Sequence, residues 1–206
     1  MSEDALIAAR ILAESRLAEE RDPHAVIERC GGRYDGDAEA GVITLPFLGA
    51  EVRLTYPQLE LAPGETLPPH VAALLVYYLA CSDGSLPVNH WVSFAELPNG
   101  EFYVNAFRGY TGAILAREFG PRPDALASAI GALGAIELPD LADAAWRIPA
   151  LPLVPIALLW WNADDEFDAR AELLFDVTAP NHLPTDGSAV LGSWTTATLL
   201  RLAGRR

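Results

Sequence analysis

The chain has 206 residues, 51% of them hydrophobic and 20% charged, which is typical of one compact domain. Its 28 acidic residues against 14 basic ones give a net charge of -14, which argues against nucleic acid and anionic membrane surfaces as partners. Every basic residue is an arginine, so Schiff-base enzymes, pyridoxal-phosphate enzymes and P-loop nucleotidases, all of which need a lysine, are excluded.

Cysteine content and hydropathy indicate the cellular setting. Cys30 and Cys81 form no CxxC motif, and we expect both to be buried thiols. The first residues include two acids where a secretory signal carries basic residues. The longest apolar run, 148–161, has about 14 residues, fewer than the roughly 20 that cross a bilayer. We therefore expect a cytoplasmic protein without a membrane partner.

The first 81 residues predict helices around a hairpin. Residues 3–20 favour a surface helix whose apolar stripe contains Ala5, Ile11, Leu12 and Leu17. Asp22 and Pro23 then supply the cap and first position of a short helix that Gly31 can close. The segment 41–56 alternates like a β-hairpin, with Val52, Leu54 and Tyr56 on one face. Residues 70–81 are apolar on every side and predict a helix at the centre of the molecule.

The remaining chain mixes strands and helices. Residues 90–104 alternate around a Pro-Asn-Gly turn, and Phe107, Tyr110 and Ile114 predict one helix that stops at 119–121. A helix opens at Pro123 and Asp124 and ends near Gly134, and the last helix spans 186–202. The sequence predicts strands at 144–149, 155–161 and 171–176.

This order of elements favours the α+β class. We expect a single domain over 1–206, with a mixed or antiparallel sheet, about five to six helices and one central apolar helix. A short C-terminal tail is expected to be disordered.

A dense acidic block, Asp164, Asp165, Glu166 and Asp168, separates the apolar segments 155–161 and 171–176. If these segments are neighbouring strands, the block is a solvated turn, which is the favoured interpretation. The alternative is a functional site, in which burial by Phe167 and nearby tryptophans would raise the pKa of one carboxyl for acid–base chemistry. The block lacks the glycine and spacing of a calcium loop, so we predict no metal site.

Five segments of the chain form a recognisable set: "PLVPIALLWWNADDEFDARAELLFD" (152–176), "WVSFAELPNGEFY" (91–103), "GGRYDG" (31–36), "FLGAEVRLTY" (47–56) and "HLPTD" (182–186). Together they resemble the uncharacterised family called domain of unknown function 3786. In the first segment the family pattern is met by Pro152, Pro155, Trp161, Asp164, Glu166, Phe167 and Leu174 to Asp176. The chain departs from the pattern at Asn99, Leu153, Ala163, Asp165 and Asp168. The resemblance implies a setting in anaerobic one-carbon metabolism, because some members resemble fusions to an iron–sulfur module of corrinoid proteins.

Other catalytic signatures are absent from the sequence. The four histidines, His24, His70, His90 and His182, show no ligand spacing, and no serine lies in a GxSxG elbow. Trp160 and Trp161 are adjacent, so in a strand they must face opposite sides. Packing is the favoured role for the five tryptophans, with an aromatic wall for a flat ligand as the alternative.

Two functions remain. The first is a non-catalytic small-molecule-binding or accessory module of unknown cofactor, whose partner is a small molecule or a protein. The family resemblance suggests a corrinoid or other tetrapyrrole as its ligand. The second is an enzyme that uses Asp164 and Glu166 as acid and base on a small substrate. The predicted ligand-binding residues are Glu96, Tyr103, Trp161, Asp164, Glu166 and Asp176.

Overall fold

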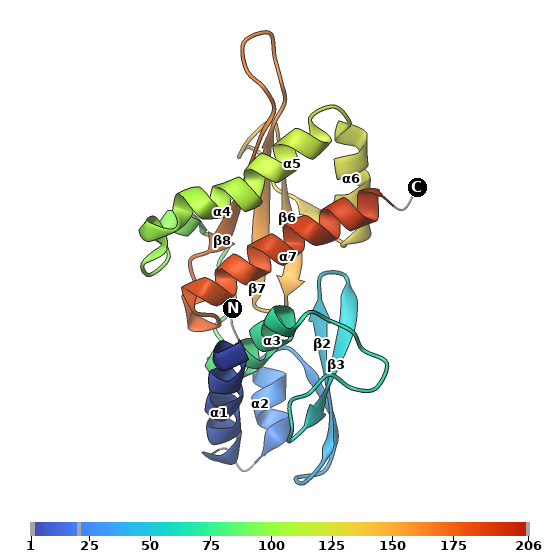
Figure 1. The fold of residues 1–206 in the computed structure, drawn as a ribbon, viewed down its shortest axis with the longest axis vertical. Helices are drawn as coiled ribbons and strands as arrows, with labels where there is room; N and C mark the ends of the chain where they lie inside the picture. Colours follow the sequence, from blue (N-terminus) through green and yellow to red (C-terminus); the bar gives the residue numbers. More distant parts are fainter. Residues whose placement is uncertain (1–2, 20–21, 205–206) are drawn as a thin grey trace.

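The structure, a computed structural model, describes residues 3–19 and 22–204 and consists of helices around two antiparallel sheets (Figure 1). The α+β class is thereby confirmed, although the strands form two sheets where one was expected. The predicted disordered tail falls on residues 205–206 and lies outside the described residues.

The first sheet has the order β1-β2-β3 and is built from Arg33–Gly36, Gly41–Phe47 and Ala50–Tyr56. The predicted hairpin is confirmed as β2 and β3, which pair from Gly41 opposite Tyr56 to Phe47 opposite Ala50. Leu48 and Gly49 make its two-residue turn with φ values of 48° and 76°, as a primed hairpin turn requires.

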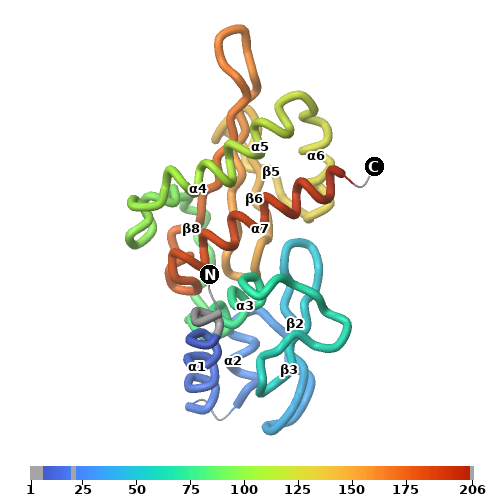
Figure 2. The backbone as a smooth tube through the Cα atoms, viewed as in Figure 1, coloured from blue at the N-terminus to red at the C-terminus, as the bar shows by residue number. Residues whose placement is uncertain are grey.

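Three helices, α1 (Glu3–Glu19), α2 (Pro23–Arg29) and α3 (Pro69–Cys81), lie beside this sheet (Figure 2). The cap of α2 is confirmed, because the Asp22 side chain accepts a hydrogen bond from the amide of His24 at 3.0 Å. The helix α3 is buried on several sides, as predicted for a central helix.

The apolar stripe predicted for α1 is wrong at Ile11 and Leu12 and confirmed at Leu17. Ile11 is 61% exposed and Leu12 38% exposed, whereas Ala9, Ala13 and Leu17 form the buried face. The side chain of Ala5 lies outside the described side chains. Alanines every four residues allow α1 to approach α3 closely, so the smaller side chains take the inner face.

The second sheet has the order β4-β8-β7-β6-β5. Its strands are Trp91–Ser93, Ile136–Glu137, Ala144–Leu151, Val154–Trp161 and Arg170–Asp176 for β4 to β8 in turn. The predicted pairing of the two apolar segments is confirmed, since β7 and β8 are antiparallel neighbours from Ile156 opposite Phe175 to Trp161 opposite Arg170. The loop that joins them projects from the end of the molecule (Figure 1).

Helices α4 (Val104–Tyr110), α5 (Gly112–Phe119), α6 (Pro123–Ala132) and α7 (Thr185–Ala203) lie over one face of this sheet (Figure 1). Three 3₁₀ turns, η1 (Phe94–Glu96), η2 (Gly100–Phe102) and η3 (Ala179–Asn181), connect helices and strands. The single helix expected from Phe107 to 119 is in fact two, because the chain bends at Thr111 between α4 and α5.

Alternation along β7 sends its two tryptophans to opposite faces, as expected. Trp160 is 3% exposed in the main core, whereas Trp161 is partly exposed beside a smaller cluster of Ala145, Ala157 and Leu159. Cys30 is buried as predicted, but Cys81 is only half-buried.

One connected core joins both sheets. Its buried side chains come from β2 and β3, from α3 and from β6, β7 and β8. The amide of Leu48 in the first hairpin donates a hydrogen bond of 3.1 Å to the carbonyl of Ala150 in β6. The Tyr78 hydroxyl of α3 donates to the carbonyl of Cys30 at 2.7 Å and accepts from the amide of Leu153 at 3.2 Å.

Candidate functional site

The acidic block lies in the projecting turn between β7 and β8, with its side chains in water. One Asp164 carboxylate oxygen accepts hydrogen bonds from the amides of Glu166 (2.8 Å) and Phe167 (2.7 Å). These backbone donors lower the pKa of Asp164, so the group stays ionised and shapes the turn. Phe167, expected to bury a carboxyl, is 70% exposed. The geometry therefore matches a solvated turn and does not favour acid–base chemistry.

Trp161 lies at the base of this turn. The Arg170 guanidinium carbon lies 4.0 Å from the centre of the Trp161 ring, as in a cation–π contact. Together with Asp164 these residues border a shallow hollow of about 550 Å³, which Glu166 does not line.

Glu96 has a local structural role. Its carboxylate accepts hydrogen bonds of 2.8 Å from both the amide and the hydroxyl of Ser93, which caps η1. These bonds lower the pKa of Glu96, and its side chain is exposed. Glu96 and Glu166 therefore both face solvent.

Asp176 is fully buried at the end of β8. Its carboxylate accepts from the amide of Asn89 (2.6 Å) and from the amide and hydroxyl of Thr178 (3.0 and 2.8 Å). With these donors it holds the loop before β4 against the end of β8. The acidic turn lies beyond the other end of this seven-residue strand, about 20 Å away.

The six predicted ligand-binding residues therefore do not converge. Trp161, Asp164 and Glu166 belong to the projecting turn, Asp176 to the opposite end of β8, and Glu96 to the cap of η1. Tyr103 alone lines a large pocket of mostly apolar character, described below.

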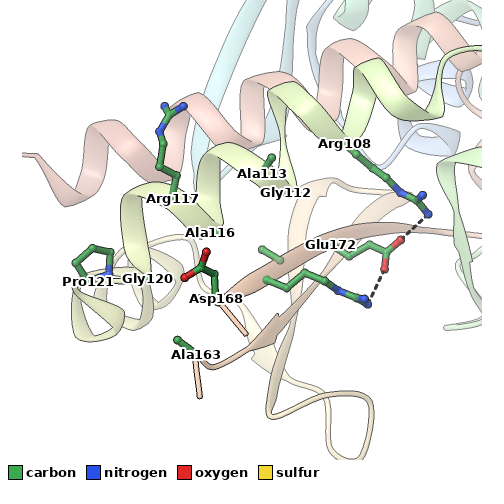
Figure 3. Close-up of a pocket in the computed structure, with 13 residues that line it drawn as sticks. Arg108, Gly112, Ala113, Ala116, Arg117, Gly120, Pro121, Ala163, Asp168 and Glu172 are labelled. Atoms are coloured by element: carbon green, nitrogen blue, oxygen red, sulfur yellow. Dashed lines mark hydrogen bonds and ion pairs between the residues drawn. The ribbon is translucent and has the colours of Figure 1, made fainter. Parts of the chain in front are cut away.

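One cavity, which we call the arginine groove, runs between α5 and β8 and has a volume of about 850 Å³ (Figure 3). Small residues such as Gly112, Ala116 and Ala171 line its walls. Arg108 and Arg170 both approach the Glu172 carboxylate, at 3.3 and 3.5 Å. Glu172 is thus already paired with two of the arginines that line this groove.

A second cavity of about 760 Å³ lies between α4, the start of α7 and the η1–η2 segment, and we call it the tyrosine pocket. Its walls include Tyr103, Tyr110, Pro98 and Pro184, with Phe94 at the buried side. Its polar groups are few, chiefly His70, Asn99, Thr185, Asp186 and Ser193. Apolar walls with a small number of polar groups are typical of small-molecule sites.

Local structure explains how this pocket forms. Asn99 adopts a left-handed conformation (φ 61°) in the Pro-Asn-Gly turn, which sends the chain back toward Tyr103 and α4. The Thr185 hydroxyl donates a 2.6 Å hydrogen bond to the carbonyl of Pro98 and so ties the start of α7 to this turn. Gly192 lets α7 close on α4, because an added Cβ would lie 2.6 Å from the Phe107 ring.

The family model described as Domain of unknown function (DUF3786) matches residues 22–198 of the chain. The chain belongs to this family. Neither a curated protein nor a solved structure matches it. The DUF3786 match confirms the resemblance drawn from the sequence and covers every residue that lines the tyrosine pocket and the arginine groove.

Two segments that carried the DUF3786 resemblance, 91–103 and 182–186, meet at the tyrosine pocket. Sequence reasoning chose Tyr103 here but missed Tyr110, Asp186 and His70. The proximity of "HLPTD" to "ELPNGEFY" in the fold was the missing information, since the two stand about 80 residues apart in the chain.

Within the described ranges, the DUF3786 structure has no cluster of three or more histidine, cysteine, aspartate or glutamate side chains placed to hold a metal ion. None of its described helices is long and apolar enough to cross a membrane.

Proposed function

We propose that this DUF3786 chain is a non-catalytic module that binds a small organic molecule in the tyrosine pocket. The observation that supports this function best is the convergence of two remote segments on one mostly apolar cavity with few polar groups. Its volume of about 760 Å³ falls within the roughly 300–1,000 Å³ that small-molecule sites occupy. The alternative enzyme gains no such support, because its proposed carboxyls Asp164 and Glu166 are solvated.

The test is a compound screen by thermal shift, followed by native mass spectrometry of protein purified anaerobically from its host. The variant Ala106→Trp fills the tyrosine pocket from an exposed position. The matched variant Ala163→Trp fills the arginine groove, also from an exposed position. We expect Ala106→Trp to abolish binding of any hit or co-purifying mass and Ala163→Trp to leave it unchanged.

The opposite pattern, in which Ala163→Trp removes the ligand and Ala106→Trp does not, would move the site to the arginine groove. Binding that survives both substitutions would contradict a site in either cavity.

The tetrapyrrole version of this proposal has a separate test. His70 offers an imidazole at the wall of the tyrosine pocket, a group that can coordinate cobalt or iron. Titration with cobalamin and with haem should then change their visible spectra and raise the melting temperature. Unchanged spectra with an unchanged melting temperature would exclude a tetrapyrrole as the ligand, and the proposal of another small molecule in the pocket would stand.

A further inference from the structure

The two large cavities differ sharply in charge. Three arginines, Arg108, Arg117 and Arg170, line the arginine groove. Among the described residues that line the tyrosine pocket there is no arginine, and Asp186 is its one carboxylate. Because the chain has no lysine, an anionic ligand in this pocket would find no permanently charged partner.

The Asp186 carboxylate is available to a ligand. It lies exposed in the first turn of α7, where one oxygen accepts a 2.9 Å hydrogen bond from the amide of Gly187. Asp186 forms no ion pair with any residue in the described part of the chain. The Asp186 charge also acts on a neighbouring group. The pKa of Tyr77 is raised mainly by burial and in addition by the negative charge of Asp186.

Aromatic rings supply further negative potential. Tyr103, the residue before α4, and Tyr110, the last residue of α4, are 65% and 37% exposed, and both line the pocket. The faces of such rings attract cations, and the attraction grows when the cation leaves water for an apolar pocket. The Tyr110 ring meets Phe107 edge to face at 5.7 Å between ring centres, which limits its movement.

The net charge of the whole molecule also favours a cationic ligand. A net charge of -14 lowers the potential around the chain, and a hollow lined by one sign of charge focuses that field. Charge complementarity therefore selects a positively charged ligand, while the apolar walls select one whose charge is attached to a hydrocarbon or aromatic body.

We infer that the tyrosine pocket binds an organic ammonium cation, with the charged nitrogen between the Asp186 carboxylate and the tyrosine rings and the apolar body against the proline-lined wall. This inference rests on the proposed function, since it names the class of ligand for the same pocket.

The test compares choline with 3,3-dimethylbutan-1-ol, a neutral alcohol of nearly the same shape in which carbon replaces the charged nitrogen. Both are titrated into the full chain and followed by amide NMR shifts of residues that line the pocket. We expect choline to bind about 3- to 30-fold more tightly than the alcohol, as a cation–π contact in a partly dry site implies.

Variants assign the preference to named groups. Asp186→Asn and Tyr103→Leu should each weaken choline binding several-fold and leave the alcohol unchanged. Asp124→Asn is the matched control, because Asp124 is also an exposed acid in the first turn of a helix but lies outside the pocket. It should alter neither affinity.

If choline and the alcohol bind with equal affinity and Ala106→Trp removes both, the preference for a cation is contradicted, while the proposal of a binding pocket stands. Choline binding that Asp124→Asn weakens as much as Asp186→Asn would also contradict this preference, since the effect would then come from net charge alone. If neither probe shifts the pocket resonances, the cation is likewise overturned. The proposed function fails with it only if the compound screen also yields no binder that Ala106→Trp removes.

Discussion

At the scale of single residues, His182 is a titratable group held inside the core. Its side chain is fully buried, and its Nδ1 lies 2.8 Å from the Ser82 hydroxyl. Burial lowers the pKa of His182, and this effect outweighs the Asp83 and Asp176 carboxylates, which act in the opposite direction. The folded protein therefore holds this imidazole in its neutral form.

A pH dependence of stability follows from this shift. Between the ordinary histidine pKa of about 6.5 and the lowered value in the fold, the unfolded chain binds more protons than the folded one. Stability is then complete above about pH 6.5 and falls as the pH drops through this window, by at most about 1.4 kcal/mol per pH unit from this residue.

Urea unfolding at pH 7.5 and pH 5.5 measures the effect. We expect His182→Gln to reduce the difference in unfolding free energy between the two pH values. His90→Gln is the comparison variant at an exposed histidine. Equal pH dependence in His182→Gln and the parent chain would show that the buried imidazole is not responsible.

At the scale of elements, the contact between α5 and β8 fixes one wall of the arginine groove. Gly112 opens α5 against the backbone of β8, where an added Cβ would lie 2.2 Å from the carbonyl oxygen of Ala171. Just before it, the Thr111 hydroxyl donates to the carbonyl of Phe107 at 2.6 Å as the chain bends. The bend and the glycine together allow the helix to touch the strand.

Alanine at this contact tests its importance. We expect Gly112→Ala to lower the free energy of unfolding by about 1–3 kcal/mol, because the added methyl group meets backbone that cannot move aside. Gly109→Ala is the control in the preceding helix, with no atom within 4 Å of the added Cβ. It should raise stability by about 0.5–1 kcal/mol through helix propensity alone. Similar effects of the two substitutions in urea unfolding would mean that the close approach is not strained.

The same contact shows where sequence reasoning reaches its limit. Local patterns predicted the hairpin 41–56, the central helix and the strands around Pro155 and Leu173, because each is encoded by periodicity and turn residues near in sequence. The break between α4 and α5 was missed, since Phe107, Tyr110 and Ile114 keep helical spacing across it. The bend places Gly112 against the Ala171 carbonyl, a contact between segments far apart in the sequence that helical spacing alone does not reveal.

The candidate site was predicted less well for a similar reason. Charge density drew attention to Asp164 and Glu166, which proved to be part of a solvated turn. The tyrosine pocket depends on the meeting of segments that follow the neighbouring strands β4 and β8 but stand far apart in the sequence, and only Tyr103 was chosen in advance.

At the scale of the whole molecule, the prediction of a single domain over 1–206 stands as an expectation. The structure supplies one connected core and the Tyr78 hydroxyl bridge between α2, α3 and the β6–β7 turn. These contacts should make the two sheets unfold together.

Two spectroscopic probes can test this cooperativity. All five tryptophans lie at or after Trp91, so tryptophan fluorescence reports on the second sheet and its helices, while far-UV circular dichroism reports on the whole chain. We expect the two signals to give one urea midpoint. Two separate midpoints, with the helical signal of α1 to α3 lost independently of fluorescence, would divide the chain into two domains.

The outer strands of the second sheet have only three residues in β4 and two in β5. The most apolar strand, β7, lies at the centre with β6 and β8 on its two sides. Edge strands this short offer another chain few backbone groups of their own to pair with, and the most apolar strand is enclosed between β6 and β8. Fibre formation from the segment around Leu158 should therefore require that the second sheet opens first and releases this strand.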